Sequence, residues 1–205
     1  DTIRFDATIK DQTIVLSTDL PSLIDNSTVI DGSTGDLDSL PHIIIDGTNI
    51  TQTVFDISAD SIELRFLNII RSANYTVQLS GGSNQSHIWG NHFGTTLDGN
   101  DTTGNRLNSK DIYLQASADF NLIGDSLGRR PNVFAGNPSD RPIYLQNATN
   151  NVIAGNIIGV SKDFSQSFSA HKGMLLSATS TNNRIGTPNS GGENVIAGLT
   201  SAAAE

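Results

Sequence analysis

The second half of the chain repeats itself without gaps, and this repetition limits the fold more than any other feature. Seven residues recur 62 positions further on. The recurring pairs are Asn121/Asn183, Ile123/Ile185, Gly124/Gly186, Asn132/Asn194, Val133/Val195, Ala135/Ala197 and Gly136/Gly198. A second echo, 65 positions apart, relates Ile88, Gly90, Asn91 and Gly94 to Ile153, Gly155, Asn156 and Gly159. Internal repeats of this kind are typical of solenoids, in which each unit buries its apolar residues against its neighbours.

Short apolar segments within the repeats predict strands rather than helices. The key segments follow one another in steps of eleven residues, in the series Ile112, Ile123, Phe134 and Met174, Ile185, Ile196. No segment keeps a 3.6-residue apolar period, so no long helix is expected. Two steps make a coil of about 22 residues with three short strands, and copies of such a coil would stack about 4.8 Å apart through parallel ladders. The sequence therefore predicts an all-β fold, a parallel β-helix (solenoid).

The chain is expected to form one continuous domain with two parts. Residues 1–66 hold short apolar runs that end in Asp-Gly turns, at Asp31-Gly32 and at Asp46-Gly47, and are predicted to form an N-terminal cap with entry strands. Residues 67–205 carry the regular apolar segments and are assigned to the repeat coils.

Composition excludes several classes of protein. The formal net charge of the 205 residues is −9, which argues against nucleic-acid binding, because phosphate recognition requires a basic surface. Cysteine is absent, so the chain has neither disulfides nor a thiolate site. No run of 18 apolar residues is present, and no membrane span is expected.

Asparagine and glycine punctuate the repeats at turns. Gly155 permits a backbone conformation that other residues avoid, and Asn156 tolerates the left-handed region and can bond to neighbouring backbone. Asn91 and Asn137 are assigned to equivalent places and, with Asn156, to part of a stacked asparagine ladder. These positions are interpreted as structural and not catalytic.

Several features favour an extracellular or cell-surface protein. The chain begins at Asp1 without an initiator methionine, which indicates either a removed leader or a fragment. Six N-x-S/T sequons suggest N-glycosylation, although a chain rich in Asn, Ser and Thr also produces sequons by chance. They lie at Asn26, Asn49, Asn74, Asn84, Asn100 and Asn147.

The segments "NNVIAGNIIG" and "NNRIGTPNSGGENVIAG", with the opening "DTIRF…VIDG…IIIDG", resemble the right-handed parallel β-helix repeat proteins of prokaryotic cell surfaces. These belong to the pectin-lyase-like fold group. The resemblance implies a right-handed coil, an N-terminal cap of some sixty residues, and secretion or surface display. It does not imply an enzyme, because many relatives are stalks or adhesive modules while others cleave acidic polysaccharides. Residues 199–205 do not resemble a cap, so we expect further protein or a neighbouring subunit to cover this end.

His87 and Trp89 form the most suggestive local feature. If Ile88 points inward, both side chains point outward from one strand, and an exposed tryptophan is a good platform for a sugar ring or a partner. The alternative is that residues 95–111 fold over Trp89.

Other polar clusters give weaker signals. The Asp98-Gly99-Asn100-Asp101 turn could hold Ca²⁺, although a solvated turn fits its spacing better. Arg129, Arg130 and Arg141 lie near Asp125 and Asp140, but neither a lyase nor a hydrolase constellation can be assembled from them. The four histidines, His42, His87, His92 and His171, show no metal-ligand spacing and are interpreted as surface residues. No catalytic residue, resident metal or cofactor is assigned.

Two functions of different classes follow from these observations. The leading hypothesis is an extracellular structural protein: a β-helical module of a filament, sheath, stalk or adhesin that associates with itself. The alternative is a carbohydrate-active enzyme, a lyase or hydrolase, or a glycan-binding module. Absence of a catalytic constellation favours the non-enzymatic hypothesis. An ice-binding solenoid is disfavoured because no regular Thr-x-Thr row appears.

Overall fold

Nearly all the regular structure is short parallel β-strand. The computed structural model describes residues 1–36, 38, 40–104, 106–137, 140–177 and 179–200. In these residues the chain forms strands β1 to β19 and a single 3-10 helix, η1 (Ala7–Ile9). The prediction of an all-β fold is confirmed. None of the described helical structure is long and apolar enough to cross a membrane.

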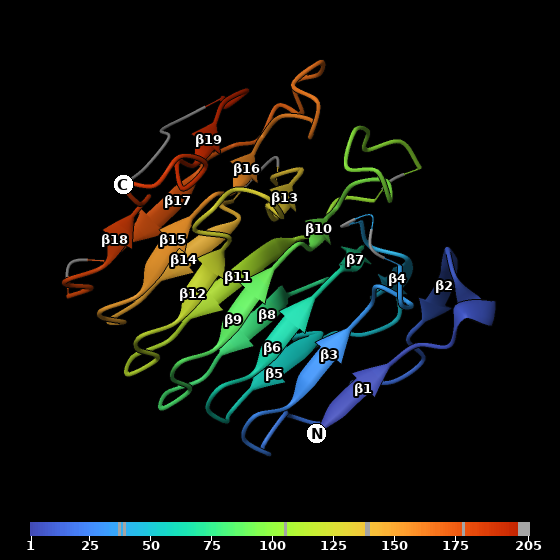
Figure 1. Cartoon of the computed structure of the whole chain (residues 1–205), viewed down its shortest axis with the longest axis horizontal. Helices are drawn as coiled ribbons and strands as arrows, with labels where there is room; N and C mark the ends of the chain where they lie inside the picture. Colours follow the sequence, from blue (N-terminus) through green and yellow to red (C-terminus); the bar gives the residue numbers. More distant parts are fainter. Residues whose placement is uncertain (37, 39, 105, 138–139, 178, 201–205) are drawn as a thin grey trace.

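The strands build three parallel sheets, which we name A, B and C (Figure 1). Sheet A contains β1 (Thr2–Arg4), β3 (Val29–Asp31), β6 (Glu63–Arg65), β9 (His87–Trp89), β12 (Leu122–Gly124), β15 (Val152–Ala154) and β18 (Arg184–Ile185). Sheet B contains β2 (Gln12–Val15), β4 (Ile43–Asp46), β7 (Leu67–Ile70), β10 (His92–Phe93), β13 (Val133–Phe134), β16 (Ile157–Ile158) and β19 (Val195–Ile196). Sheet C contains β5 (Phe55–Ile57), β8 (Tyr75–Leu79), β11 (Lys110–Leu114), β14 (Ile143–Leu145) and β17 (Met174–Leu176).

From β3 onward the chain visits the three sheets in turn, so each strand pairs with the strand three places later. β6 pairs with β9, β7 with β10 and β8 with β11, all in parallel. We call one visit to each sheet a circuit. This order fits a parallel β-helix, and in Figure 1 the two termini lie at opposite ends of the stack.

Most circuits are longer than the predicted 22 residues. Ile123 stacks on Ile153, and Ile153 stacks on Ile185, so the 62-residue repeat spans two circuits. The eleven-residue step from Ile112 to Ile123 carries the chain from sheet C to sheet A, and three such steps are needed to close a circuit. The circuit length also varies, because the turns between sheets differ in size: Phe55 pairs with Val77, 22 residues on, whereas Phe93 pairs with Phe134, 41 residues on.

The core is a stack of inward-facing columns, one or more from each sheet. In sheet A the column is Ile30, Leu64, Ile88, Ile123 and Ile153, each fully or almost fully buried. Phe93 and Phe134 stack face to face in sheet B with ring centroids 4.7 Å apart. Burying side chains of this size stabilises the fold by about 1.5–3 kcal/mol each. The core is therefore continuous along the stack.

Residues on both sides of position 66 share this core. β4 pairs with β7 and β5 pairs with β8, so strands of the predicted entry region lie in the same sheets as the repeat coils. One buried cluster extends from Leu16 to Met174. Residues 201–205, the end of the predicted coil region, lie outside the described part of the chain.

Stacked asparagines form two ladders along the turns, and the first lies between sheets A and B. The Oδ1 of Asn132 accepts the backbone N–H of Asn91 at 3.0 Å, and its Nδ2 donates to Asn156 Oδ1 at 3.1 Å. Asn194 Oδ1 accepts the N–H of Asn156 at 3.1 Å. A second ladder, Asn121, Asn151 and Asn183, runs along the turn before sheet A. Each amide thus satisfies backbone groups that would otherwise be buried without partners.

The predicted ladder contained one wrong member. Asn91 and Asn156 belong to the same ladder, but Asn137 lies at the turn between sheets B and C, where its Nδ2 donates to the carbonyl of Asn108 at 3.0 Å. The positions equivalent to Asn91 are Asn132 and Asn194, because the true register follows the strand pairing and not the distance from the nearest glycine. Gly155 precedes Asn156 with φ of +63°.

Candidate functional site

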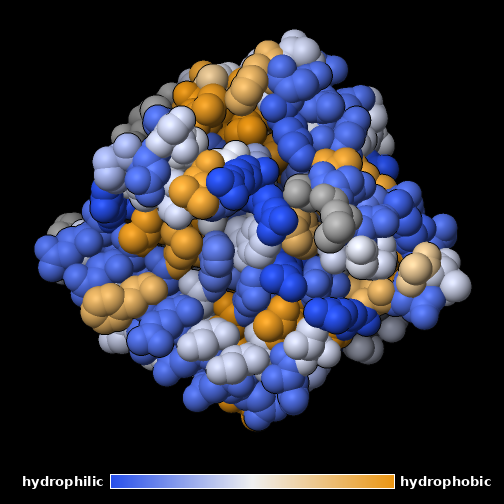
Figure 2. Space-filling view, viewed as in Figure 1, coloured by the Kyte–Doolittle hydropathy of each residue, from blue (hydrophilic) through white to orange (hydrophobic). Residues whose placement is uncertain are grey.

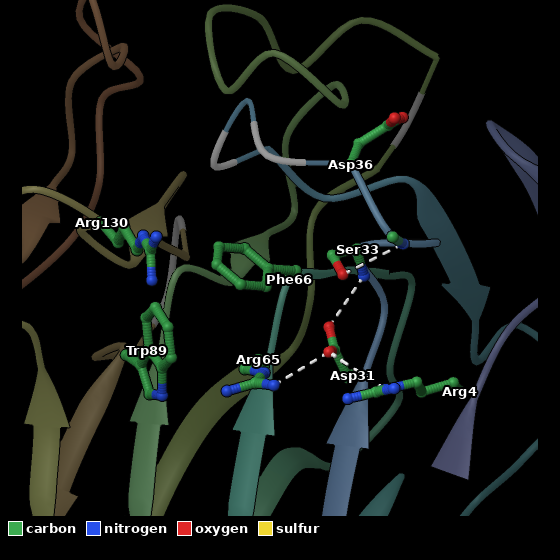
Figure 3. Close-up of a pocket in the computed structure, with 9 residues that line it drawn as sticks. Arg4, Asp31, Ser33, Asp36, Arg65, Phe66, Trp89 and Arg130 are labelled. Carbon is green, nitrogen blue, oxygen red and sulfur yellow. Dashed lines mark hydrogen bonds and ion pairs between the residues drawn. The ribbon is translucent and has the colours of Figure 1, made fainter.

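A row of unlike side chains crosses the outer face of sheet A. Arg4, Asp31, Arg65 and Trp89 are successive register partners on β1, β3, β6 and β9. Their neighbours Ile30, Leu64 and Ile88 point inward, so alternation along each strand turns this row outward. Figure 3 shows the row along one side of a pocket of about 320 Å³.

The charged members of the row are held by one another. Arg65 donates from Nη2 to Asp31 Oδ2 at 2.9 Å and from Nη1 to Glu63 Oε1 at 2.8 Å. Arg4 lies further off, with its Nε 3.9 Å from Asp31 Oδ2, and its side chain is 72% exposed. Burial raises the pKa of Asp31, but bonds from Arg65 and Ser33 outweigh it and leave that pKa below the usual value. Asp31 and Arg65 are therefore both charged at neutral pH.

Trp89 points outward but is covered. Its ring packs edge-on against Phe66 (4.9 Å between centroids) and stacks on His87 (5.4 Å). Its Nε1 donates to Glu63 Oε1 at 2.7 Å, and only 8% of the residue is exposed. The prediction of an exposed tryptophan platform is wrong, because Phe66 and Glu63 of the preceding circuit and His87 of the same strand cover the ring. These covering residues do not come from 95–111.

Phe66 reaches the pocket through an unusual backbone conformation. Its φ is +55°, in the left-handed region that bulky residues avoid. The residue that follows each neighbouring strand of sheet A is a glycine, Gly32 after β3 and Gly90 after β9. A Cβ on Gly90 would lie 2.8 Å from the Phe66 ring. Phe66 thus occupies a position that is glycine after the neighbouring strands, and its ring fits because Gly90 has no side chain.

Arg130 lies above both aromatic rings. Its guanidinium carbon is 5.1 Å from the Trp89 ring centroid and 5.6 Å from that of Phe66. In Figure 3 its side chain comes from the opposite side of the pocket to Arg65 and Asp31. Such cation–π contacts contribute about 0.5–2 kcal/mol each. Arg130 therefore closes the pocket over the indole.

A second hollow, of about 250 Å³, adjoins the first across Trp89 and Arg130. His87, Asp125, Leu127 and Arg129 complete its lining. Asp125 Oδ2 accepts the backbone N–H groups of Arg129 and Arg130, both at 3.0 Å, which fixes the loop that carries them. Burial lowers the pKa of His87, so the ring is neutral at pH 7 and its Nε2 donates to the Gly124 carbonyl at 2.8 Å.

The two hollows thus bring together four arginines, three carboxylates and the rings of Phe66 and Trp89. The members are Arg4, Arg65, Arg129, Arg130, Asp31, Asp36, Asp125, Phe66 and Trp89. We call this set the arginine–aromatic pocket. In the view of Figure 2 the surface is largely hydrophilic, with apolar patches scattered among polar residues. Guanidinium donors beside carboxylate acceptors, with aromatic rings beneath, form a surface that can bind vicinal hydroxyl and carboxylate groups.

Other predicted clusters are distributed elsewhere. Arg141 forms an ion pair with Asp140 at 2.6 Å and lies over Tyr144 on sheet C, away from Arg129 and Arg130. There Tyr75, Tyr113 and Tyr144 stack with centroids 4.6 and 5.1 Å apart. Sequence reasoning missed this tyrosine stack.

The Asp98–Asp101 turn uses its carboxylates for local bonds. Asp98 Oδ1 accepts the Thr96 hydroxyl at 2.5 Å and the Asn100 N–H at 3.1 Å. Asp101 Oδ1 accepts the N–H of Thr102 at 2.6 Å. The alternative of a solvated turn describes this geometry better than a calcium loop.

The interpretation of the histidines as surface residues is wrong for two of them. His42 is 6% exposed and His92 is 1% exposed. Burial lowers the pKa of His92 to about 3, so this ring stays neutral inside the fold. His42 lies against Asp36 and Asp38, a set whose ligand atoms are close enough to hold a metal ion. Spacing along the chain concealed this cluster.

None of the six sequon asparagines is buried. Asn26, Asn49 and Asn147 are exposed, and Asn74, Asn84 and Asn100 are half-buried. Some are engaged: Asn84 Oδ1 accepts the Asp119 N–H at 2.9 Å, and Asn100 Oδ1 accepts the Asp163 N–H at 3.0 Å. The geometry is compatible with glycan attachment at the exposed three.

In comparisons with known proteins, no family model matches the chain, and neither a curated protein nor a solved structure matches it. The functional argument therefore depends on the residues of this chain alone.

Proposed function

We propose that the chain is a module of a right-handed parallel β-helix protein displayed outside the cell, and that it acts as a structural element that associates with itself. The parallel sheets, the three-strand circuit and the stacked asparagines support this class. The resemblance of the repeat segments to prokaryotic surface proteins supports display, and the polar, uncharged turns suit an extracellular surface. This function needs no catalytic group.

The observation that carries the proposal is that, among the described residues, the first and last strands of sheet A and the first strand of sheet B carry exposed apolar side chains. At one end, Ile3 on β1 is 47% exposed and Val15 on β2 is 52% exposed. Ile3 also lines a hollow of about 280 Å³ whose other lining residues are apolar as well. At the other end, Ile185 on β18 is 45% exposed. Strand edges of this kind pair readily with another chain, and a head-to-tail contact that does not close produces a fibre.

The test is assembly state as a function of concentration. Sedimentation velocity and negative-stain electron microscopy of the purified chain should show end-to-end oligomers that grow with concentration. Ile185→Asp should abolish them, because a carboxylate would be buried unpaired at the joint. Phe164→Asp is the matched control, since Phe164 is 60% exposed in a loop. A protein that stays monomeric throughout the range would overturn self-association.

A second candidate is a glycan-binding module, and the arginine–aromatic pocket favours it. Its volume, about 320 Å³, lies at the lower end of the range for small-ligand sites, about 300–1,000 Å³. The pocket offers exposed guanidinium at Arg4 and a guanidinium lid at Arg130. A sugar that carries a carboxylate matches these donors, and its hydroxyls match the acceptor oxygens of Asp31 and Asp36.

The glycan proposal is tested by titrating oligosaccharides of uronic acids and of neutral hexoses while following tryptophan fluorescence. The molecule has one tryptophan, Trp89, so the signal reports this pocket. Saturable change with uronides, lost in Arg4→Ala, would support the proposal. No saturable change with any sugar would remove it, and release of shortened or unsaturated products would indicate an enzyme instead.

A further inference from the structure

Three metal-binding side chains meet beside the first strands of the stack. Asp36 and Asp38 lie in the segment between β3 and β4, and His42 immediately precedes β4. Their ligand atoms all lie within 4.8 Å of one another. The segment is held against the turn before β2, where the N–H of Asp11 donates to the His42 carbonyl at 2.7 Å.

His42 is oriented as a metal-ligating histidine is. Its ring is almost completely buried, with a side chain 7% exposed. Nδ1 lies 2.7 Å from Asp11 Oδ1, and Nε2 faces Asp38 Oδ2 at 3.0 Å and Asp36 Oδ2 at 3.3 Å. Ligating imidazoles usually donate their second N–H to a carboxylate in this way, which fixes the ring and leaves the other nitrogen for the metal. Asp11 thus occupies the orienting position.

The distances from His42 Nε2 to the two carboxylates suit a tetrahedral ion. Zinc binds imidazole nitrogen and carboxylate oxygen at about 2.0–2.2 Å, and tetrahedral angles then place neighbouring ligand atoms roughly 3.3 Å apart. The two distances from Nε2, 3.0 and 3.3 Å, agree with that value. Calcium would need six or more oxygen ligands, and this cluster supplies too few of them.

An independent observation concerns Asp36 Oδ2. The oxygen atom itself is enclosed by protein, although the Asp36 side chain as a whole is 41% exposed. It is approached by the Lys10 ammonium, 2.5 Å away, and by His42 Nε2. A buried carboxylate oxygen of this kind is costly unless a cation lies against it. Lys10 supplies that charge in the metal-free form, and its side chain is 41% exposed and free to swing away.

We propose that His42 Nε2, Asp36 and Asp38 bind one Zn²⁺ ion, with Asp11 as the orienting residue and the remaining position open to water. Binding displaces Lys10 from Asp36 and releases the proton of Nε2. The ion joins the turn before β2 to the segment before β4 and so stiffens the first circuit. Because Asp36 also lines the arginine–aromatic pocket, the ion lies at the rim of that pocket. The inference is independent of self-association and of glycan binding.

The experiment is calorimetric titration of the metal-free full chain with Zn²⁺, with thermal unfolding followed in parallel. One ion per chain and a raised Tm are expected. His42→Gln and Asp38→Asn should each weaken binding by about tenfold or more, and Asp11→Asn by about tenfold. His171→Gln is the matched control, because His171 lies outside the cluster, and it should bind as the parent does.

Two further measurements keep the proposal open to refutation if a cluster variant unfolds. Lys10→Met removes a competing cation and should tighten Zn²⁺ binding by about threefold or more. Co²⁺ bound to the parent chain should give the intense visible bands of a four-coordinate N/O site. Absence of saturable Zn²⁺ binding, unchanged binding in folded Asp38→Asn, or equal affinity for Ca²⁺ would each overturn the proposal.

Discussion

The asparagine ladder and the arginine–aromatic pocket lie on opposite sides of the same backbone and are built on opposite principles. In the ladder, Asn91, Asn132, Asn156 and Asn194 repeat one residue in successive circuits, and each passes a hydrogen bond to the next. In the pocket, neighbouring circuits contribute unlike residues: Arg4, Asp31, Arg65 and Trp89 are equivalent in register, but no two successive members are of the same type.

The difference follows from what parallel stacking demands. A buried polar group must find a partner in the circuit above or below, and an amide that both donates and accepts can do so indefinitely. An outward residue has no such requirement, because water satisfies it. Outward residues that are partners in register but change from circuit to circuit are therefore not needed for stacking. Their variation marks a surface that can recognise a ligand.

The strongest test of the comparison is to break the ladder at its centre. Asn132 is fully buried, its Oδ1 accepts from the Asn91 N–H, and its Nδ2 donates to the Ile88 carbonyl at 2.8 Å. Asn132→Ala leaves these backbone groups unpaired, so the free energy of unfolding should fall by about 3 kcal/mol or more. Urea unfolding followed by circular dichroism measures the loss.

The matched control for this change is Asn49→Ala, which removes an exposed asparagine from a turn. We expect a change within about 0.5 kcal/mol. Equal losses of unfolding free energy in the two variants would show that a ladder asparagine stabilises the fold no more than a surface amide does. The contrast between ladder and pocket would then be wrong.

Two glycines differ in how closely other atoms approach them: Gly155, beside the ladder, lies in a crowded turn, and Gly82 lies in an open one. Gly155 has φ of +63°, and a Cβ there would lie 2.0 Å from the Asp125 carbonyl oxygen. Gly82 has φ of +93° with nothing within 4 Å of its Cβ position. Gly82→Ala should cost only the left-handed conformation, about 1 kcal/mol, and Gly155→Ala about 2–3 kcal/mol because the backbone must also shift. Matching Tm losses would contradict the close stacking at Gly155.

The same contrast explains how much of the molecule the sequence predicts. Parallel β-structure was predictable, because stacking places residues such as Ile123 and Ile185 in one column, where apolar side chains recur along the chain. The circuit length was not, because turns of different size separate the strands and a two-circuit repeat looks like a repeat of one unit. The pocket was hidden for a related reason. Asp31 and Arg65 become neighbours only through a strand register that spacing alone does not reveal.

Asp111, a buried carboxyl outside the asparagine ladders, should make the stability of the fold depend on pH. Burial raises the pKa of Asp111 to about 7, and the Asn108 Nδ2 donates to its Oδ1 at 3.0 Å. Because the folded pKa exceeds the unfolded value, near 3.8, its stabilising effect is complete below about pH 4 and is lost as the pH rises to 7. Asp111→Asn removes this dependence.

Above pH 7 the Asp111→Asn variant should therefore be more stable than the parent, by up to about 4 kcal/mol for a shift of that size, and the two should converge at pH 4. Thermal unfolding of both proteins across this range measures the difference. Asp25→Asn, at an exposed position, is the control and should track the parent throughout. A constant offset between parent and Asp111→Asn would show that the carboxyl does not titrate in this window.

The smallest effect on stability is expected at Arg130, where the comparison predicts that structure and recognition separate. Arg130→Met keeps the hydrocarbon cover over Phe66 and Trp89 but removes the guanidinium, so the free energy of unfolding should fall by no more than about 1 kcal/mol. If the pocket binds an acidic sugar, loss of a charge-assisted contact should weaken that binding by about tenfold. Arg184→Met, on β18 at the far end of sheet A, should change neither the fluorescence titration nor the affinity. A large loss of stability in Arg130→Met would show that this side chain, like the ladder asparagines, is needed to stabilise the stack.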